Sequence, residues 1–300
     1  SVAYSGSDTI AKTVRVQLHR NSFKPFDYGL FGVTKSVIGS MSVANSYNSK
    51  TGKTNLKNCP MGSNATTAGA VEVQMWATLN GSAYCGKNGN PATAIKNNGT
   101  ITGSKSAQTE NKPIIPVPSP PTLPNKGALN VPAGSVITIT ENAEYDSITI
   151  GNTAELKIAS NVTLYVKGAC TLGGAGGVWS RLTITNTASA IIYLGGSLTT
   201  GNQCEINNTR DPSKLVFMTT STFSGPFKLQ NQTETKAAIY APNSTVSVTG
   251  QGMLKGSMVA NTAQVTGQGG LYYDEALKDF NLPISGATGF LVASWHEKVI

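Results

Sequence analysis

The chain has 300 residues, a formal net charge of +8, 13% charged residues and 32 glycines. This composition excludes a coiled coil and a charge-rich disordered chain, and it favours an all-β fold with many turns. No apolar run reaches the ~18 residues that a membrane span needs. The Lys and Arg residues are scattered singly along the chain, so we expect no nucleic-acid partner.

Short alternating runs predict strands in the first third of the chain. Val14–Leu18 and Val71–Met75 alternate apolar and polar residues, and Asp27–Ser49 contains short apolar runs separated by Gly and Ser. Because side chains of a strand point to opposite faces in turn, one face of each run would lie in a core. We therefore predict an N-terminal β-rich domain at residues 1–112.

A proline-rich segment follows at residues 113–125, with the sequence PIIPVPSPPTLPN. Each proline ring fixes φ and removes a hydrogen-bond donor, so the segment favours an extended polyproline II conformation. We interpret it as a semi-rigid linker between the N-terminal domain and a second domain at residues 126–300.

The second domain contains short, evenly spaced strand patterns and one internal repeat. The pentapeptide Val-Thr-Gly-Gln-Gly begins at Val248 and again at Val265, and it places Gly250 and Gly267 at equivalent turns. Self-similarity at this spacing is typical of a stacked array, in which each coil buries its apolar face only against the next coil. We predict a right-handed parallel β-helix, with both valines pointing into its core. A helical turn at Asp274–Lys278 would form a C-terminal cap that covers the end of the array.

Several stretches also resemble a known family. Tyr240-Ala241-Pro242-Asn243 precedes Gly-punctuated strands and the sequence YYDEAL at Tyr272–Leu277, and Ser294-Trp295-His296-Glu297 stands near the end. FDYGLFG at Phe26–Gly32 and NSYNS at Asn45–Ser49 stand near the start. Together they resemble the C-terminal domain of PilX-type, type IV pilus-associated proteins. The structural positions singled out by this resemblance and the repeat are Tyr240, Pro242, Asn243, Gly250, Gly267, Tyr273, Asp274, Glu275 and Trp295.

The resemblance implies a bacterial, extracellular protein of the cell surface. Its role would be that of a non-catalytic structural subunit of a pilus-like filament, either a minor pilin or a tip or adhesion module. Its partners would be pilin subunits or other minor pilins, with surface polysaccharide as a further partner. Members of the family contact the membrane through an N-terminal hydrophobic helix that this chain lacks, and the chain starts at Ser1 rather than Met. We therefore expect a processed product of a longer protein.

Export would also favour disulfide bonds. The cysteines are Cys59, Cys85, Cys170 and Cys204, an even number without a CxxC motif. Of the three possible pairings, Cys59–Cys85 with Cys170–Cys204 keeps each bond within one half of the chain. The alternative is four buried free thiols, because a free cysteine packs as a small hydrophobic residue.

Two other functions fit a β-helix. One is a polysaccharide lyase or hydrolase, which needs carboxylates gathered on one face. The acidic residues of the second half, Glu155, Glu205 and Glu234 among them, do not recur at a constant coil spacing. We therefore expect no catalytic residues, no metal site and no cofactor. The other is a polymer-forming scaffold of the bactofilin kind, which would be cytoplasmic.

Overall fold

A computed structural model describes residues 2–5, 8–20, 23–173, 179–283 and 290–299. Contacts divide the chain into two units, Ser1–Lys24 with Asn281–Ile300, and Pro25–Phe280. In the described part, no helix is long and apolar enough to cross a membrane.

The smaller unit is an antiparallel sheet with the strand order β1-β2-β28. Its strands are β1 (Val2–Ser5), β2 (Asp8–Arg20) and β28 (Phe290–Val299). Trp295, which the family resemblance singled out, pairs with Val16 through the backbone. Its side chain lies outside the part of the chain whose side chains are described.

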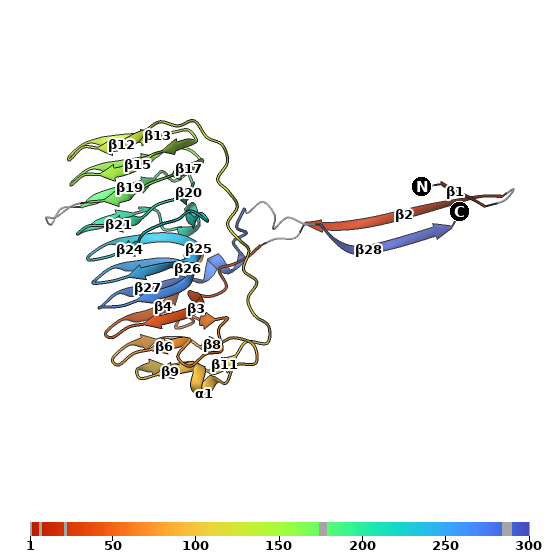
Figure 1. Cartoon of the computed structure of the whole chain (residues 1–300), viewed down its shortest axis with the longest axis horizontal. Helices are drawn as coiled ribbons and strands as arrows, with labels where there is room; N and C mark the ends of the chain where they lie inside the picture. The colour runs from red at the N-terminus through yellow and green to blue at the C-terminus, as the bar shows by residue number, and fades with distance from the viewer. Residues whose placement is uncertain (1, 6–7, 21–22, 174–178, 284–289, 300) are drawn as a thin grey trace. The chain divides into compact units, whose positions relative to one another are not determined.

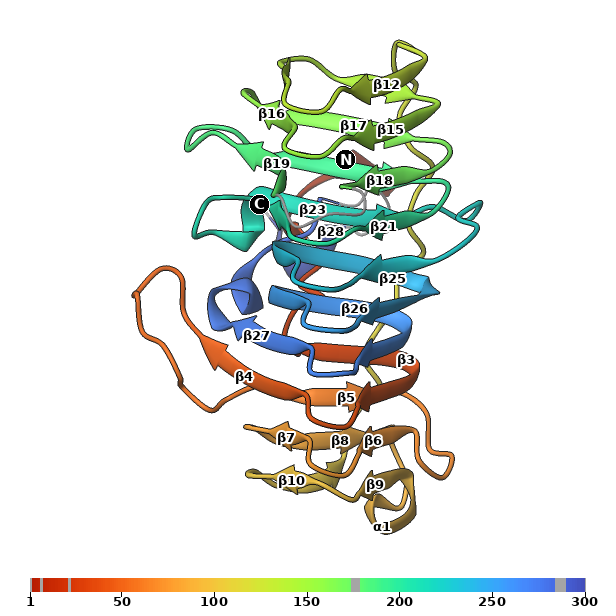
Figure 2. The same cartoon turned by 90° about the vertical axis from the view of Figure 1, so that its left-hand side faces the viewer.

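The larger unit is a parallel β-helix, as the sequence predicts, built from three columns of parallel strands (Figures 1 and 2). Column A contains β12 (Ala128–Val131), β15 (Ser147–Ile150), β18 (Cys170–Leu172), β21 (Leu198–Thr200), β24 (Phe227–Leu229), the ends of β25 (Glu234–Val248), β26 (Met253–Val265) and β3 (Leu30–Ile38), then β6 (Val71–Val73) and β9 (Ile95–Asn97).

Column B contains β13 (Val136–Ile139), β16 (Glu155–Ile158), β19 (Ser180–Ile184), β22 (Cys204–Ile206), the starts of β25 and β26, β27 (Gly270–Asp274), β4 (Val43–Tyr47), β7 (Thr78–Leu79) and β10 (Thr100–Ile101). Column C contains β14 (Ala143–Tyr145), β17 (Val162–Val166), β20 (Ala190–Leu194), β23 (Leu215–Thr219), the middles of β25 and β26, the start of β3, β5 (Met61–Ser63), β8 (Ala83–Cys85) and β11 (Lys105–Ala107). Short helical turns are α1 (Pro91–Ala94), η1 (Pro212–Lys214) and η2 (Glu275–Asp279).

The internal repeat marks two successive coils. Val248 pairs with Val265 in column A, and both side chains are fully buried in the common hydrophobic core. The prediction that the two valines point into one core is therefore confirmed.

The order of the coils in space differs from their order in the chain. The chain begins the solenoid in the middle of the stack at β3 and β4, runs to β11 at one end, crosses to β12 at the other end, and returns to β27 (Figures 1 and 2). There β27 pairs with β4 and β26 pairs with β3. The predicted boundary at residue 112 is thus corrected, because residues 25–111 and 126–280 form one continuous solenoid.

The proline-rich segment is a strap along the solenoid and does not separate two domains (Figure 1). The outward residues of column C beneath it are apolar and buried, as Met218 and Val259 illustrate. Tyr240 fixes the strap, because its hydroxyl accepts a hydrogen bond from the Ile115 N–H at 3.0 Å and donates one to the Ile115 carbonyl at 2.7 Å. Val117 is buried as well. The proline-rich segment therefore packs on the apolar outer face of column C, whereas a linker between two domains would be surrounded by water.

The ammonium of Lys112 secures the lower part of the strap. It forms an ion pair with Asp27 and lies over the rings of Tyr28 and Phe31, 5.4 Å and 5.6 Å from their centroids. Burial lowers the pKa of Lys112, and the negative charge of Asp27 opposes that shift. The residue immediately before the strap is thus tied to Asp27, Tyr28 and Phe31 by an ion pair and by cation–π contacts.

Gly250 and Gly267 form stacked turns at the corner between columns A and B, with φ of +65° and +64°. A Cβ at Gly250 would lie 3.0 Å from the Asn231 nitrogen of the preceding coil. We expect Gly250→Ala to lower the free energy of unfolding by ~2–3 kcal/mol, from the left-handed backbone together with the tight contact. Gly127→Ala, where φ is +73° and no atom lies within 4 Å, should cost only ~1 kcal/mol. Urea unfolding followed by circular dichroism measures both, and equal losses would contradict the stacking argument.

Candidate functional site

The last strands of the solenoid meet the first ones at what we call the seam, where β26 and β27 pair with β3 and β4. Along β27 and β4, Tyr273 lies opposite Ser46 and Asp274 lies opposite Tyr47. In column C, Met258 lies opposite Leu30. The segments Phe26–Gly32, Asn45–Ser49 and Tyr272–Leu277, which the sequence analysis grouped by resemblance alone, are therefore neighbours in space.

Polar contacts hold the seam together. Asp274 is fully buried, and its Oδ1 accepts hydrogen bonds from the N–H groups of Ser49 at 2.9 Å and Ala276 at 3.1 Å. Glu275 accepts a hydrogen bond from the Ser46 hydroxyl at 2.9 Å. The contacts to Ser49 and Ser46 join the end of the solenoid segment to its beginning, so Asp274 and Glu275 have a structural role here.

Tyr273 adds a third link across the seam. Its hydroxyl donates a hydrogen bond of 2.8 Å to the carbonyl of Phe26. Burial, followed by the negative charge of Asp27, raises the pKa of Tyr273 well above its usual value. The hydroxyl therefore stays protonated and keeps donating.

The helical turn expected at Asp274–Lys278 exists as η2, with Asp274 as its N-cap, but its position corrects the prediction. It lies at the seam, within the stack, whereas α1 lies at one end of the solenoid (Figure 1). The chain leaves the solenoid at this point, so η2 marks the exit of the chain and covers no open end of the stack.

Two further motif residues lie at a corner of β25, the strand that pairs with β26. Pro242 is buried and Asn243 is exposed, in the part of β25 where the pairing register with β26 shifts between Ala241 and Thr245. These two residues therefore shape the turn from column C to column A, while Tyr240 holds the strap.

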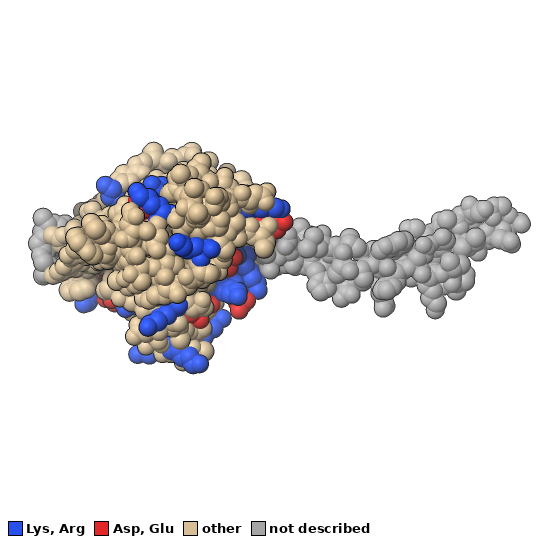
Figure 3. All heavy atoms as spheres, turned by 90° about the horizontal axis from the view of Figure 1, so that it is seen from below, with Lys and Arg blue, Asp and Glu red and all other residues tan. Residues whose placement is uncertain are grey.

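A pocket opens beside the seam on the outer face of column B, with a volume of about 490 Å³. We call it the basic pocket, because four of its lining side chains are cationic. It is formed by the loop 46–55, Arg210, Lys236, Lys255, Met253 and Tyr272, and Lys53 lies on that loop. The cations elsewhere are dispersed, and Figure 3 shows Lys and Arg spread over the face at the end that carries α1.

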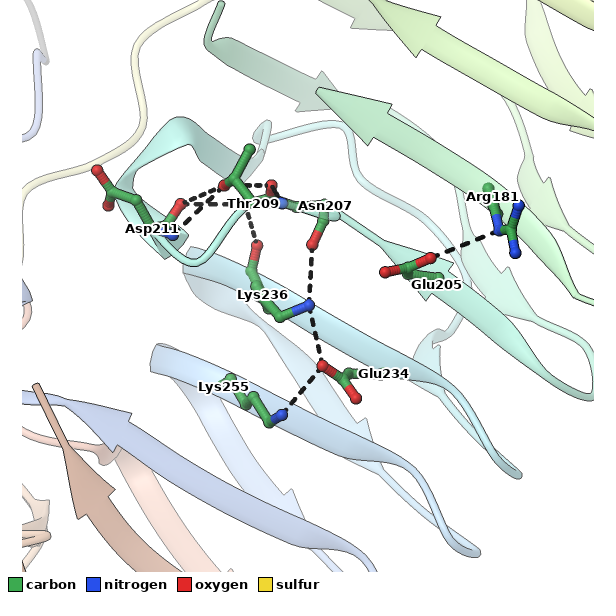
Figure 4. A network of polar contacts seen from close by, with 8 residues as sticks. All are labelled: Arg181, Glu205, Asn207, Thr209, Asp211, Glu234, Lys236 and Lys255. Carbon is green, nitrogen blue, oxygen red and sulfur yellow. Dashed lines mark hydrogen bonds and ion pairs between the residues drawn. The ribbon is translucent and has the colours of Figure 1, made fainter. Parts of the chain in front are cut away.

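The charges in the basic pocket are organised around one carboxylate (Figure 4). Glu234 Oε1 lies 2.9 Å from the ammonium of Lys236 and 3.0 Å from that of Lys255. Burial acts to raise the pKa of Glu234, but the hydrogen bonds from both lysines outweigh burial and hold that pKa below its usual value. Glu234 is therefore ionised and shared between two cations, which leaves the trio with a net positive charge.

Asn207 holds the neighbouring loop 207–211 that carries Arg210 (Figure 4). Its amide nitrogen donates to the carbonyls of Asp211 at 3.1 Å and Lys236 at 2.9 Å, and its oxygen accepts from the Thr209 N–H at 3.0 Å. The residue is fully buried and has a φ of +62°. Sequence analysis missed it, although Asn207-Asn208 followed by Asp211-Pro212 is a turn signal.

The expectation that the acidic residues of the second half do not line up is corrected by the structure. Register places Glu155, Arg181, Glu205 and Glu234 in one row on column B. The coils differ in length, so equal positions in space are unequally spaced in sequence. Arg181 lies 3.5 Å from Glu205. Across the described residues, no three His, Cys, Asp or Glu side chains are grouped so that they could hold a metal ion.

The disulfide prediction was wrong, since Cys59, Cys85, Cys170 and Cys204 are all buried free thiols. In column C, Met61 pairs with Ala83, so Cys59 and Cys85 are offset by four positions along adjacent strands. At ~3.3 Å per residue this separates their Cα atoms by more than the ~7 Å that a disulfide can span. Cys170 and Cys204 lie in different columns. The even count therefore reflects core packing.

The thiols should be inert in the folded protein. Burial raises the pKa of Cys170 to about 12 and also raises the pKa of Cys59 and Cys204. The thiolate needed for reaction is therefore scarce at pH 8, and access is blocked. We expect a disulfide reagent such as DTNB to titrate none of the four thiols in the native protein and all four in denaturant. A native mass lower by the hydrogens of two disulfides would contradict this.

Comparisons with known proteins give one family match and three structural likenesses. Residues 145–280 match a family described as a domain of unknown function (DUF7305). No characterised protein matches in sequence. An ice-binding protein from an Antarctic bacterium of the Flavobacteriaceae is 8% identical with a TM-score of 0.30, covering 82% of this chain and 96% of its own.

The other two likenesses are equally distant. The ice-binding protein of the Antarctic ascomycete Antarctomyces psychrotrophicus is 11% identical with a TM-score of 0.30, covering 83% of this chain and 95% of its own. The competence-associated pilin ComZ of Thermus thermophilus is 9% identical with a TM-score of 0.28, covering 100% of this chain and 80% of its own. At these scores, none of the three carries a functional argument.

Proposed function

We propose that this protein is a non-catalytic structural subunit of a type IV pilus-like filament, displayed at the bacterial cell surface as a minor pilin or a tip or adhesion module. The observation that carries the proposal is the seam. Two segments near the start of the chain and one more than 200 residues later, all of which resemble PilX-type proteins, meet there and close the solenoid. Because these motifs form one structural junction, they support the resemblance to PilX-type proteins more strongly than three unconnected motifs would.

A second feature supports display on a filament. The rings of Phe26 and Phe280 lie 6.2 Å apart, so the chain begins and leaves the solenoid at neighbouring points. Because the chain enters and leaves the solenoid at neighbouring points, a filament could carry the solenoid as a side module without a break in the contacts between its subunits. The surface location rests on the motif resemblance, because four free thiols do not support an oxidising compartment.

The experiment is deletion of the gene, followed by electron microscopy of pili and an adhesion assay. We expect altered pilus number, length or adhesion, restored by the wild-type gene and not by a gene carrying the core substitution Val265→Asp. Site-specific cross-linking should join the protein to pilin subunits. Unchanged pili and adhesion, with no cross-linked pilin, would reject the proposal.

The row of carboxylates favours a polysaccharide lyase or hydrolase as the second candidate. Glu205 and Glu234 lie opposite each other on adjacent coils. Both, however, are held by cations, and the lowered pKa of Glu234 makes it a poor proton donor. We expect the purified protein to leave pectin and alginate intact. Cleavage that Glu234→Gln or Glu205→Gln abolishes would favour this candidate instead.

A further inference from the structure

We propose that the basic pocket binds an acidic oligosaccharide of the uronic-acid class, with the sugar carboxylate held between its cations. This goes beyond a structural role, since it assigns a ligand and a site. It does not depend on incorporation into a filament, so either proposal can fail while the other stands.

The charge balance of the pocket favours an anionic ligand. Glu234 is shared by Lys236 and Lys255, while Lys53 and Arg210 form no ion pair with any described residue. The carboxylate of the nearby Asp211 is already engaged, because its Oδ1 accepts hydrogen bonds from the N–H and hydroxyl of Ser213 at 2.9 Å and 2.6 Å. A planar guanidinium matches a carboxylate in two parallel hydrogen bonds, so Arg210 is the primary contact expected.

An unused donor lies at the same place. Tyr47 is among the residues that line the pocket, and its hydroxyl oxygen is buried with no hydrogen-bond partner among the described residues. Burial, together with the negative charges of Asp274, Asp211 and Glu234, raises the pKa of Tyr47 far above its usual value. The hydroxyl therefore stays protonated, and a ligand oxygen that displaces the side chains covering it would satisfy this unused donor.

The uncharged lining favours a sugar over a simple phosphate. Tyr272 offers an aromatic ring and Met253 an apolar side chain, while Asn48, Ser49 and Asn55 offer amide and hydroxyl groups. Sugars present both an apolar face and hydroxyls, so they use both kinds of surface. A volume of about 490 Å³ falls in the usual range for small-ligand sites. An extended nucleic-acid backbone would need a long row of cations, whereas these are gathered in one pocket.

The backbone that carries Arg210 is held in place before any ligand binds. Asn207 fixes the loop 207–211 through its bonds to Asp211 and Lys236, and Lys236 is itself a pocket residue. A loop that is already fixed loses little conformational entropy on binding.

The test is isothermal titration of the whole chain with trigalacturonate, its methyl-esterified form and a short single-stranded DNA. We expect binding of trigalacturonate alone, weakened about tenfold by Arg210→Ala and by Tyr47→Phe, and weakened further at high salt. Lys228→Ala removes an exposed lysine from column A, outside the pocket, and should leave binding unchanged. Circular dichroism verifies that each variant is folded.

Equal binding of the methyl ester, equal weakening by Lys228→Ala, preferential binding of DNA, or no binding of trigalacturonate would each overturn the proposal. To separate this proposal from the proposed role in a filament, pilus number and length are measured in cells that carry Arg210→Ala. Normal pili together with lost saccharide binding would support the binding site and leave filament assembly unaffected.

Discussion

Replacing Val265 with Asp should lower the free energy of unfolding by ~4 kcal/mol or more, which is enough to unfold many domains. Val265 is fully buried and lies between Val248 on one side and Ile38 on the other. A carboxylate at this position would have no partner in an apolar core, so it would either remain charged at high cost or bind a proton. The loss should therefore shrink below about pH 4, where the introduced Asp is protonated in both states.

Urea unfolding followed by circular dichroism measures this loss, and Gln264→Glu is the matched control. Gln264 precedes Val265 on the same strand but points outward and is partly exposed. A charge there should change stability by less than ~0.5 kcal/mol. Similar losses for both variants would mean that the inward and outward faces of β26 are assigned incorrectly.

Removing the Asp274 carboxylate should have the second largest effect. Asp274→Ala removes the acceptor of the Ser49 and Ala276 N–H groups inside the seam. We expect a loss of ~3 kcal/mol, because a hydrogen bond to a charged group contributes about 1.5–3 kcal/mol and the abandoned donors stay buried. The loss should be local first, so β4 should exchange its amide hydrogens faster than β17, which lies far from the seam in the stack.

Two conservative variants test whether the seam contacts are the cause. Asp274→Asn keeps an oxygen that can accept from Ser49, and Glu275→Gln keeps the acceptor for Ser46. Both should lose less than half as much stability as Asp274→Ala. If Asp274→Ala left hydrogen exchange in β4 unchanged, the seam would not depend on this residue.

The sequence predicted the coils better than it predicted their arrangement. Alternation and the repeat from Val248 to Val265 were sufficient for a parallel β-helix, because identical short coils must stack in register. The sequence predicted short, evenly spaced strands in the second domain, whereas residues 234–248 form the single long strand β25, which passes through its corner without a break. The chain accommodates Pro242 within this strand by a shift of register.

Other features depend on contacts that local sequence does not encode. No local pattern predicts that β27 pairs with β4, because the two strands are more than 200 residues apart. Either strand could pair with any exposed strand edge of the solenoid. The cysteine count suggested disulfides, although inward positions of a β-helix suit small apolar residues such as Cys85. Unequal coil lengths concealed both the alignment of Glu205 with Glu234 and the basic pocket beside it.

The strap connects one end of the stack to the other, which couples the length of the connector to the number of coils. One extra coil lengthens the solenoid by about 4.8 Å, whereas an extended polyproline segment advances about 3.1 Å per residue. A relative that gains a coil must therefore gain one or two residues between β11 and β12, or shift Ile115 away from Tyr240. Among relatives, an insertion of one coil should therefore be accompanied by an insertion in the proline-rich segment.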